Sequence, residues 1–452
     1  MKNYSKTKII ATIGPSSWDA PVLKEMYSAG MDIARINASF ADFAELERVS
    51  NTLRTTSPRI GIMLDTQGHK IRVTGLEHEI QIEGEISIPN TFDITYPDLY
   101  KDVSVGTRIL LDDGNIQLVV KAIQDIEVIC TVIQPGILKP NKTVNIPDVN
   151  LNFPAITEKD KADILFAVEH RFDFLSLSFV RNREDILTVR ELIGDSNIKL
   201  IAKIENVQGV ENFDEILAAT DAIMIARGDL GIEIPFEKVP ILQKQFIYKC
   251  RQAGKPVIVA TQMLESMKES IQPTRAEISD VANAVISAET STGRNPVVAV
   301  ATMQKIAKEA ESVLQQSPIY GHTSAPLEVD ELCRNLCDIS ESMKLKGIVV
   351  ISNTGQTVLS LSRHRPNAPI WEISSSLEQI RHDSLLNGVT GFFLKDLPQD
   401  RDECTQHAVE VVYAQGELDL NDKVAIISGS SIRHNTTDAI LEIVQVKNVL
   451  SR

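Results

Sequence analysis

The chain has 452 residues, a length that predicts two to four domains rather than one core. It carries 46 Lys and Arg against 61 Asp and Glu, which gives a net charge of −15 at pH 7. Nucleic acids and lipid surfaces are polyanions, so we expect neither as a partner of so acidic a chain. A local basic pocket could still hold a small anion.

We also do not expect this chain to be secreted or to span a membrane. The first residues, MKNYSKTKII, lack the apolar stretch of a secretory signal, and no run of 18 apolar residues could span a bilayer. The cysteines are odd in number and scattered, with no second pair to complete a zinc site, which favours reduced thiols. We therefore expect a cytoplasmic protein. The cysteines are Cys130, Cys250, Cys333, Cys337 and Cys404.

The first part of the chain alternates short apolar runs with helical patterns. Residues 7–14 (TKIIATIG) indicate a buried strand, and residues 21–30 have helical spacing that stops at Gly30. Residues 31–37 and 59–65 are the next two apolar runs. Near-continuous apolar strands separated by helices are typical of parallel βα units.

The pattern changes between residues 69 and 153, where we predict no helix of note. Residues 77–88, 107–120 and 127–134 mostly alternate apolar with polar side chains, as strands with one buried face do. The sequence LDDGN at residues 111–115 is a strong hairpin-turn signal. This segment is therefore predicted to be a small all-β domain that emerges from a loop of the main fold.

The βα rhythm returns after Thr157, with apolar runs at residues 172–180, 199–206, 222–231 and 256–264. Together with the three earlier runs they make seven parallel strands, which predicts an α/β fold of the (β/α)8 TIM-barrel type. An open doubly wound sheet is the alternative. No G-x-G-x-x-G motif follows any of these strands, which disfavours its dinucleotide-binding version.

A third unit begins at about Ser317. Residues 346–355 and 423–431 indicate parallel strands, and residues 401–416 indicate a helix with a Gly stop, so we predict an open α/β domain. The predicted divisions are 1–68 for the first part of the barrel, 69–153 for the inserted domain, 154–316 for the second part of the barrel, and 317–452 for the C-terminal domain.

Polar residues at the carboxyl ends of the predicted barrel strands are candidate site residues, because barrel enzymes place their active sites there. A purely structural explanation would gather all of them on one rim without a purpose, and we favour a functional one. The candidates are Arg35, Asn37, Ser39, Asp65, Thr66, Ser178, Lys203, Glu205, Arg227, Asp229 and Thr261.

The types of these residues point to phosphoryl transfer. Glu205 and Asp229 follow successive strands and offer the hard oxygen ligands that Mg²⁺ prefers. Lys203 is two residues before Glu205, so both side chains should lie on one face, where an ammonium beside a metal suits a transferring phosphoryl group. Arg35 could add a fork of donors to a phosphate. The alternative for Lys203 is an ordinary ion pair with Glu205.

Several long sequence strings carry a family resemblance. In ARGDLGIEIP, Gly228 and Gly231 allow a tight turn that brings backbone N–H groups close to an anion. This string, IAKIEN and ATQMLESM-x5-PTRAE are specific. With TKIIATIGP, GMDIARIN, LDTQGHKIR, SFVR and SAET they occur in the order found in pyruvate kinases. From about Lys6 to its C-terminal end, the chain resembles that family.

The resemblance implies transfer of the phosphoryl group of phosphoenolpyruvate to ADP, giving pyruvate and ATP, with Mg²⁺ (or Mn²⁺). Lys203 would stabilise the phosphoryl group in flight, while Glu205 and Asp229 would hold the metal. Thr261 and Ser287 would lie where a proton reaches C3 of the enolpyruvate. The inserted domain would close over the cleft as a small β-barrel lid. Substrate or nucleotide contacts would come from Arg35, Arg72, Lys142, Ser178, Gly228, Asp229 and Thr261.

In the family, the C-terminal domain binds phosphorylated effectors. A polar loop after a predicted strand could cradle a phosphate through its backbone amides, although it could also be a plain surface turn. By analogy with the family we expect a homotetramer. The loop residues are Ser352, Asn353, Thr354, Gly355, Gln356 and Thr357.

One departure from the family concerns monovalent cations. Many family members have Glu where this chain has Lys70, and those members need K⁺. A fixed ammonium can replace the mobile cation, so we predict activity that does not require K⁺. The residue types of a monovalent-cation site are nevertheless present, at Asn37, Ser39, Asp65 and Thr66.

Two other departures keep alternatives open. Phe40 and Ala41 stand where the family usually has His-Gly on the nucleotide side, and residues 281–290 (VANAVISAET) lack the turn that usually precedes SAET. The eighth barrel strand should therefore be shortened or missing. A catalytically weakened homologue that acts as a regulatory or effector-binding subunit is one alternative. Another Mg²⁺-dependent barrel enzyme for enolpyruvate-like substrates is a second, against which the lid and C-terminal domain count.

Overall fold

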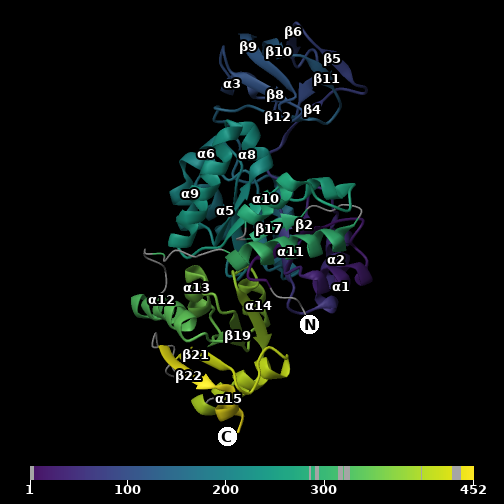
Figure 1. Ribbon diagram of the computed structural model, residues 1–452. Coiled ribbons are helices and arrows are strands. Elements are labelled where there is room, and N and C mark those ends of the chain that lie inside the picture. Colours follow the sequence, from purple (N-terminus) through teal and green to yellow (C-terminus); the bar gives the residue numbers. More distant parts are fainter. Residues whose placement is uncertain are drawn as a thin grey trace.

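The chain folds into three parts along one long axis, with the barrel in the middle (Figure 1). The inserted domain lies at one end of the barrel and the C-terminal domain at the other. This computed structural model describes residues 5–284, 287–290, 295–313, 319, 326–398, 400–429 and 439–451, without the side chains of 287–290, 429 and 439.

Eight parallel strands close the central barrel in the order β1-β17-β16-β15-β14-β13-β3-β2. The seven predicted strands are confirmed, because their apolar runs are buried on both faces. The strands are β1 (Lys8–Ile13), β2 (Ile33–Asn37), β3 (Gly61–Asp65), β13 (Phe174–Leu177), β14 (Lys199–Ile204), β15 (Ala222–Ala226), β16 (Val257–Ala260) and β17 (Ser287–Thr290).

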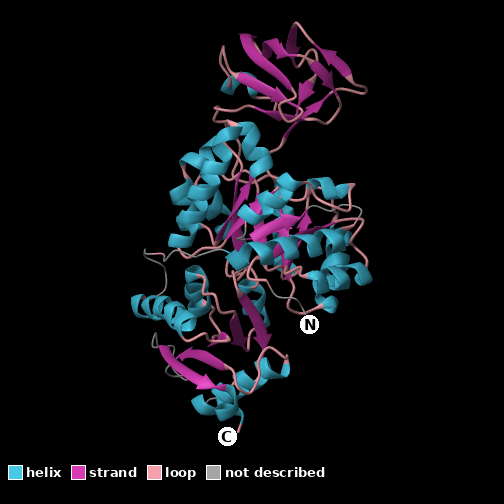
Figure 2. Cartoon of the chain, viewed as in Figure 1, coloured by secondary structure: helices cyan, strands magenta, loops and turns pink. Residues whose placement is uncertain are grey.

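Helices surround this barrel, as the cyan ribbons of Figure 2 show. Several begin with a side-chain cap; Thr157 and Thr274, for example, each form a capping box. The helices are α1 (Ala20–Ala29), α2 (Phe43–Thr56), α4 (Glu158–Glu169), α5 (Arg183–Ile193), α6 (Val207–Glu211), α7 (Phe213–Ala219), α8 (Arg227–Glu233), α9 (Val239–Gln252), α10 (Arg275–Asn283) and α11 (Pro296–Val313), with short 3-10 turns η1 (Phe236–Lys238) and η2 (Glu265–Lys268).

The eighth strand is present and short. Helix α10 ends at Asn283, and β17 begins at Ser287. Within the described residues, strand β17 pairs with β1 at four positions and with β16 at one, Val259 with Ala288. The possibility that the strand is missing is therefore wrong, and the described part of β17 has four residues, as β13 and β16 have.

The C-terminal domain closes the amino-terminal mouth of the barrel. Inside the barrel a buried apolar cluster includes Ile10, Met63 and Ile258, and Leu385 of the C-terminal domain packs into it. Because the core of the barrel includes this side chain, the two parts share apolar burial rather than only touching at their surfaces. The opposite mouth, where the strands end, faces the inserted domain (Figure 1).

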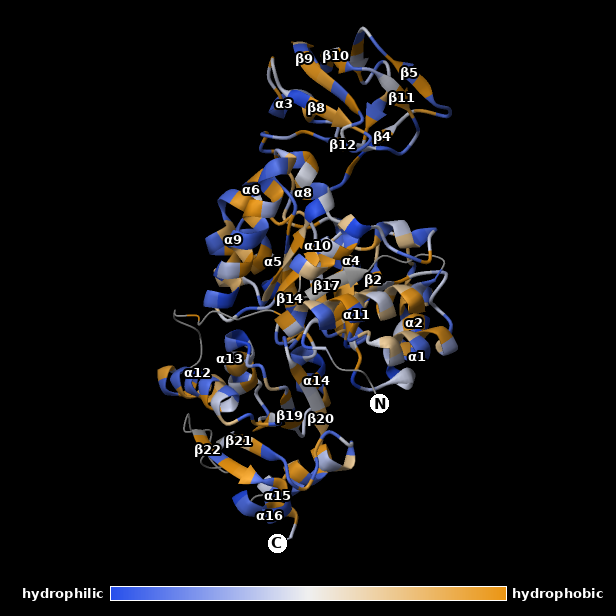
Figure 3. Cartoon of the chain, viewed as in Figure 1, coloured by the Kyte–Doolittle hydropathy of each residue, from blue (hydrophilic) through white to orange (hydrophobic). Residues whose placement is uncertain are grey.

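The inserted domain is all-β apart from the single turn α3 (Leu99–Asp102), as predicted. Its strands alternate hydrophobic and hydrophilic residues (Figure 3) around their own apolar core. The LDDGN turn joins β8 to β9, with positive φ at Asp112, Asp113 and Gly114. The strands are β4 (Ile71–Thr74), β5 (Ile80–Ile82), β6 (Glu85–Ile88), β7 (Asp93–Ile94), β8 (Arg108–Leu111), β9 (Ile116–Gln124), β10 (Glu127–Gln134), β11 (Gly136–Leu138) and β12 (Thr143–Asn145).

The C-terminal domain is an open α/β unit, as predicted. Its sheet has the order β20-β19-β18-β21-β22, and the edge strand β22 is antiparallel. None of the helices in the described part of the chain has the length and hydropathy that a bilayer span requires. The elements are α12 (Leu327–Ser342), β18 (Gly347–Ile351), α13 (Gln356–His364), β19 (Ile370–Ser374), α14 (Leu377–Asp383), β20 (Val389–Phe393), α15 (Arg401–Ala414), β21 (Lys423–Gly429), β22 (Ala439–Gln445) and α16 (Val446–Leu450).

Candidate active site

A network of buried charges lies at the carboxyl end of the barrel. The Lys203 ammonium is 3.2 Å from Oδ1 of Asp65 and 3.0 Å from Oε1 of Glu205, and it donates to Oγ of Ser178 at 2.9 Å. Arg35 donates to Oδ2 of Asp65 at 2.6 Å. Residues predicted from the ends of β2, β3, β13 and β14 thus meet in one place, because parallel strands end at the same edge.

Opposite charges keep Lys203 and Asp65 ionised although both are buried. Burial opposes the charge of Lys203, yet the carboxylates of Asp65 and Glu205 raise the pKa of its ammonium. Burial would likewise raise the pKa of Asp65, but Arg35 and Lys203 lower it. Since Lys203 is 6% exposed and Asp65 2%, water screens these charges little. Such fixed charges need no reorganisation when a charged group arrives.

Two acidic residues have the properties of divalent-metal ligands. Glu205 is fully buried; its Oε2 accepts from the backbone N–H of Phe179 at 2.7 Å, whereas its Oε1 has only the ion pair with Lys203 among the described residues. Burial raises the pKa of Glu205 against the charge of Lys203, and the nearby charge of Asp229 raises it further. Asp229 lies in the first turn of α8 and is partly exposed. A divalent cation between the two carboxylates would remove this repulsion.

The described residues contain no cluster of three or more His, Cys, Asp or Glu side chains arranged to hold a metal. A cation at Glu205 and Asp229 would therefore have to take its other ligands from water or substrate oxygens. Mg²⁺ is usually bound in this way, through one or two carboxylates together with phosphate oxygens and water. The pair thus fits an ion that binds together with a phosphorylated substrate.

Thr261 and Gly228 are locked together beside the network. The backbone N–H of Gly228 donates to Oγ1 of Thr261 at 2.6 Å, and this hydroxyl donates to the carbonyl of Ala260 at 2.7 Å. A Cβ on Gly228 would lie 3.2 Å from the same hydroxyl, so glycine permits the close approach. Thr261 and Gln262 have φ of 67° and 57°, a left-handed conformation that is strained for such residues and concentrates at functional sites.

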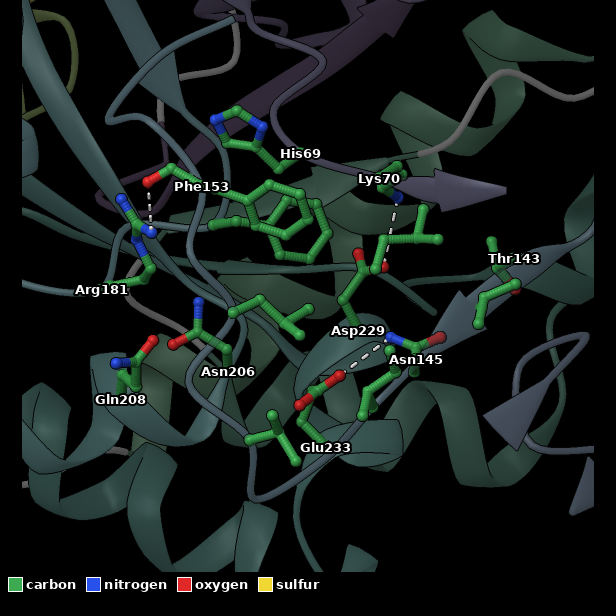
Figure 4. A pocket seen from close by; sticks show the side chains of 16 residues that line it. His69, Lys70, Thr143, Asn145, Phe153, Arg181, Asn206, Gln208, Asp229 and Glu233 are labelled. Atoms are coloured by element: carbon green, nitrogen blue, oxygen red, sulfur yellow. Dashed lines mark hydrogen bonds and ion pairs between the residues drawn. The ribbon is translucent and has the colours of Figure 1, made fainter. Parts of the chain in front are cut away.

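A cleft of about 730 Å³ separates the barrel rim from the inserted domain (Figure 4). Lys70 and Asp229 line it, and the Lys70 ammonium is 3.2 Å from Oδ1 of Asp229. Asn145 of β12 donates to Glu233 of α8 at 3.0 Å, which links the two domains across the cleft. Asp229 therefore stands between the buried network and the cleft.

The two ends of the inserted domain lie side by side. The ring of His69 at its entry stacks on Phe153 at its exit, with centroids 4.6 Å apart. Arg181 of the barrel donates to the carbonyls of Phe153 and Pro154 at 3.1 and 3.3 Å, and a bidentate contact with Asp185 holds Arg181. One arginine thus ties the exit of the inserted domain to the barrel.

Comparison with known proteins decides the family. A family model described as the pyruvate kinase barrel domain matches residues 4–300, and one described as the pyruvate kinase alpha/beta domain matches residues 330–444. The chain belongs to the pyruvate kinase family. It is therefore an enzyme of the phosphotransferase class.

Several curated relatives named pyruvate kinase match nearly the whole chain. The one from Geobacillus stearothermophilus is 39% identical over 480 aligned residues, covering 99% of this chain and 81% of the relative. The one from Clostridium acetobutylicum is 36% identical, with 97% of this chain and 99% of the relative covered. The one from Clostridium perfringens is 40% identical, covering 84% and 87%. The likeness thus includes the inserted domain as well as the barrel.

The residues predicted to bind a monovalent cation instead contact hydrogen-bond donors and cationic side chains of the protein itself. Oδ1 of Asn37 accepts from the N–H of Ser39 at 2.9 Å, and Asp65 binds Arg35 and Lys203. Oγ1 of Thr66 accepts from the N–H of Ser178 at 3.1 Å. In this arrangement cationic side chains already neutralise Asp65.

Other predicted residues of this pyruvate kinase family site lie apart from the network. Arg72 donates to the carbonyl of Asn141 at 3.0 Å, and Lys142 is 2.5 Å from Oδ1 of Asp112, so both make their contacts within the inserted domain. Ser287 is placed by its backbone in β17, but its side chain lies outside the described residues.

The predicted effector loop connects β18 to α13. Gly355 has φ of 71°, and its N–H donates to Oγ of Ser352 at 3.0 Å. Oδ1 of Asn353 accepts from the N–H and hydroxyl of Ser375 at 3.0 and 2.9 Å. The predicted stretch, Ser352 to Thr357, thus runs into the first turn of α13, and whether it binds an effector stays a prediction.

Sequence reasoning missed several residues that complete the site. Thr12 of β1 accepts from Arg35 at 2.7 Å, and the same strand-end argument would have found it. Glu233 lies within the ARGDLGIEIP string, but its partner Asn145 is 88 positions away, so only the fold reveals the pair. The backbone N–H of Phe179 that binds Glu205 has no signal in the sequence.

Proposed function

We propose that this chain transfers the phosphoryl group of phosphoenolpyruvate to ADP, giving pyruvate and ATP, with Mg²⁺ or Mn²⁺ held by Glu205 and Asp229. The observation that carries the proposal is the buried, charged Lys203 between Asp65 and Glu205 at the carboxyl end of the barrel. When bound, the metal supplies positive charge to the phosphoryl oxygens.

Lys203 is the proposed main stabiliser of the phosphoryl group in flight. Its ammonium has three N–H donors and neighbouring carboxylates that keep it charged. The negative charge of a transferring phosphoryl group spreads over its equatorial oxygens, where a fixed cation is most effective. Arg35, already oriented by Thr12 and Asp65, would contribute a second set of donors to a phosphate. Ser178, which accepts from Lys203, would help to position it and to bind substrate.

The enolate left after transfer needs a proton at C3. Thr261 is the proposed residue on that side, with Ser287 at the neighbouring strand end. The Thr261 hydroxyl is held between Gly228 and Ala260, and its strained backbone fixes where it points. A relay to C3 would require this hydroxyl to exchange its bond to the Ala260 carbonyl for one to solvent or substrate.

Closure of the inserted domain is the proposed step that protects the reaction. Moving this lid over the cleft would carry Arg72 and Lys142 toward the nucleotide and exclude water, which would otherwise hydrolyse the donor. The proximity of His69 to Phe153 at its two linkers favours rotation of the domain as one body. The contact between Asn145 and Glu233 would then be one of those that change.

The proposal also covers the K⁺ requirement, the effector, the oligomeric state and the cellular location. K⁺ is not required in this proposal, because Lys70 lies next to Asp229 and supplies a fixed positive charge. A phosphorylated effector at the loop from Ser352 to Thr357, a homotetramer and a cytoplasmic location complete it. The five cysteines are free thiols, which is usual in a reducing compartment.

No observation favours the alternative of a catalytically weakened homologue. Strand β17 closes the barrel beside Thr261, and all four charged residues of the network are in contact. Phe40, which with Ala41 and the stretch before SAET raised the alternative, is a largely exposed side chain on the loop after β2. Its ring is not placed in the cleft between the domains.

The test is pyruvate formation from phosphoenolpyruvate with ADP and Mg²⁺, in Na⁺ and in K⁺ buffers. We expect turnover in both, and we expect Lys203→Met to lower kcat by about 10²–10³-fold or more, since it removes a preorganised charge. Lys244→Met is the matched control, because Lys244 is exposed on α9. Turnover that Lys203→Met leaves intact, in a folded protein, would contradict the proposal.

A further inference from the structure

A second pocket, of about 390 Å³, lies between the barrel and the C-terminal domain. On the barrel side it is lined by the last turn of α9 and the start of β16, and on the other side by the end of α13 and the segment after α14. Strand β16 runs from this pocket to Thr261. The effector loop lies at the other end of α13, so the pocket is separate from it.

Four cationic side chains line this pocket, and two of them are held by the protein itself. Arg363 is 3.3 Å from Oδ2 of Asp330 and donates to the carbonyl of Gln252 at 3.2 Å. The ammonium of Lys255 donates to the carbonyls that end α7, at 2.7, 3.0 and 2.7 Å. The three carbonyls belong to Leu217, Ala218 and Thr220.

The positive charges of the other two side chains, Arg251 and Arg365, are not balanced by an acidic partner of their own among the described residues. Nε and Nη2 of Arg251 are buried, and no hydrogen-bond acceptor reaches them among the described residues. The acid that acts on Arg365 is Glu311, whose carboxylate already accepts from the backbone of Lys6 and from Thr7. An arginine side chain placed in this way requires a partner, because a buried unsatisfied charged donor is costly.

The pKa values reflect the same crowding of positive charge. Burial, and next the charge of Arg363, lowers the pKa of Arg251. Burial, and next the charge of Arg251, lowers the pKa of Arg365 to about 9. Both guanidinium groups therefore remain charged at neutral pH and repel each other. Because these arginine side chains stay protonated, only a bound anion can neutralise their charge.

We propose that this pocket is a binding site for the phosphate group of a small anion, either inorganic phosphate or a phosphate ester, with Arg251 of the barrel and Arg365 of the C-terminal domain as its ligands. The planar fork of a guanidinium matches phosphate oxygens bidentately. The acidity of the whole chain excludes a larger polyanion.

The position of the site gives the anion a route to the active site. An anion held by Arg251 and Arg365 joins two domains, so it binds best when their interface is intact. Leu385 lines this pocket and also packs into the apolar interior of the barrel beside Ile258 of β16. Occupancy should therefore stabilise the packing at one end of the strand that leads to Thr261, and should raise the unfolding temperature of the chain.

The test is calorimetric titration of the full chain with inorganic phosphate and with glycerol 3-phosphate at constant ionic strength. We compare wild type with the double variant Arg251→Gln/Arg365→Gln and with the control Lys244→Gln, which changes an exposed lysine of the same helix α9. We expect one class of site to weaken at least tenfold in the double variant and to be unchanged in the control. Tighter binding of the ester would assign the site to phosphate esters, and equal binding would assign it to the phosphate group alone.

A second variant covers the case in which the double variant folds poorly. Asn387 lines the same pocket, and Asn387→Asp would place a carboxylate there with almost no change of shape. We expect this variant to have a higher unfolding temperature than wild type in phosphate-free buffer, and to lose the further rise that phosphate gives wild type. If phosphate has no effect on wild type, or if its effect survives in both variants, the proposal is wrong.

Discussion

Two buried carboxylate clusters in this chain have opposite electrostatic surroundings. At the carboxyl end of the barrel, Asp65 and Glu205 face Lys203 and Arg35 at 2.6 to 3.2 Å. In the C-terminal domain, Glu372 of β19 and Asp383 at the end of α14 face each other, and both are buried. In the first cluster the carboxylates are paired with opposite charges, whereas in the second two carboxyl groups face each other and are accommodated by holding a proton.

The basic pocket between the domains is the counterpart of the acidic pair. Each of the two sites gathers charges of one sign. A carboxylate can be neutralised by accepting a proton, whereas a guanidinium group remains protonated and charged. The acidic pair is therefore neutralised from within, and Arg251 with Arg365 requires an anion from outside. Charge balance thus distinguishes a preorganised charged network at the candidate active site, a proton-binding pair and a candidate ligand site in one chain.

The balance in the barrel can be broken with Asp65→Asn, for which we expect the largest effect. The substitution keeps the shape but leaves Arg35 and Lys203 buried with one carboxylate fewer. Removing one partner of a buried ionic network costs about 3–5 kcal/mol, which we expect in the free energy of unfolding, measured by urea denaturation. Loss of turnover should accompany it, since Lys203 loses a neighbour that keeps it in place.

The matched control is Asp148→Asn, which removes the carboxylate of another Asp–Arg pair. Asp148 and Arg108 are 3.1 Å apart on the surface of the inserted domain, with exposed fractions of 65% and 56%. Such a pair contributes about 0–1 kcal/mol. Similar losses for the two variants would mean that burial does not set the strength of the barrel network.

The acidic pair can be probed through pH. Burial is the first cause that raises the pKa of Asp383, from an ordinary 3.8 to about 7, and burial together with Asp383 raises that of Glu372. The folded chain thus retains a proton that the unfolded chain releases near pH 4. Stability contributed by Asp383 should therefore fall as pH rises from 3.8 to about 7.

We expect Glu372→Gln to remove most of this dependence and to stabilise the protein at pH 8, on the order of 3 kcal/mol, because its amide can donate to Asp383 at any pH. The measurement is the unfolding temperature between pH 5 and pH 8, with Glu378→Gln on the exposed face of α14 as the control. A pH profile of Glu372→Gln that runs parallel to wild type would show that the pair does not hold the proton.

The sequence predicts the charged network far better than the other two clusters. Strand-end positions are set by local apolar runs, so Asp65, Lys203 and Glu205 could be assigned to one rim before any fold was known. Glu372 and Asp383, or Arg251 and Arg365, come together only through tertiary packing of segments with no shared local pattern. What makes both clusters unusual is the lack of an opposite charge next to them in the described part of the fold, and no sequence pattern shows that.

The eighth strand shows the same limit at the level of secondary structure. SAET contains one clearly apolar residue, Ala288, so neither hydrophobic periodicity nor β propensity marks it as a strand. Its conformation is set by β1, with which it shares four register positions. A segment whose structure depends on its neighbour is predictable only after the neighbour has been placed.

Lys70→Met gives the smallest expected change in stability. It tests the partly exposed ion pair at the cleft against the buried network of the barrel. Lys70 and Asp229 are 3.2 Å apart but 28% and 24% exposed, so solvent screens the pair and we expect less than about 1 kcal/mol in unfolding free energy. Activity should respond more strongly. Without the fixed ammonium, turnover should fall in Na⁺ and recover when K⁺ replaces Na⁺, because a mobile cation can then occupy the vacated position.

Kinetics in Na⁺ and K⁺ buffers of equal ionic strength check this, with Lys142→Met as the control. Lys142 is also a partly exposed lysine paired with an aspartate, Asp112, at 2.5 Å, but its partner lies within the inserted domain. Its substitution should leave the ratio of the two rates near one. If Lys70→Met also shows equal rates in both salts, Lys70 does not stand in for the monovalent cation, and the charge beside Asp229 serves only to balance that carboxylate.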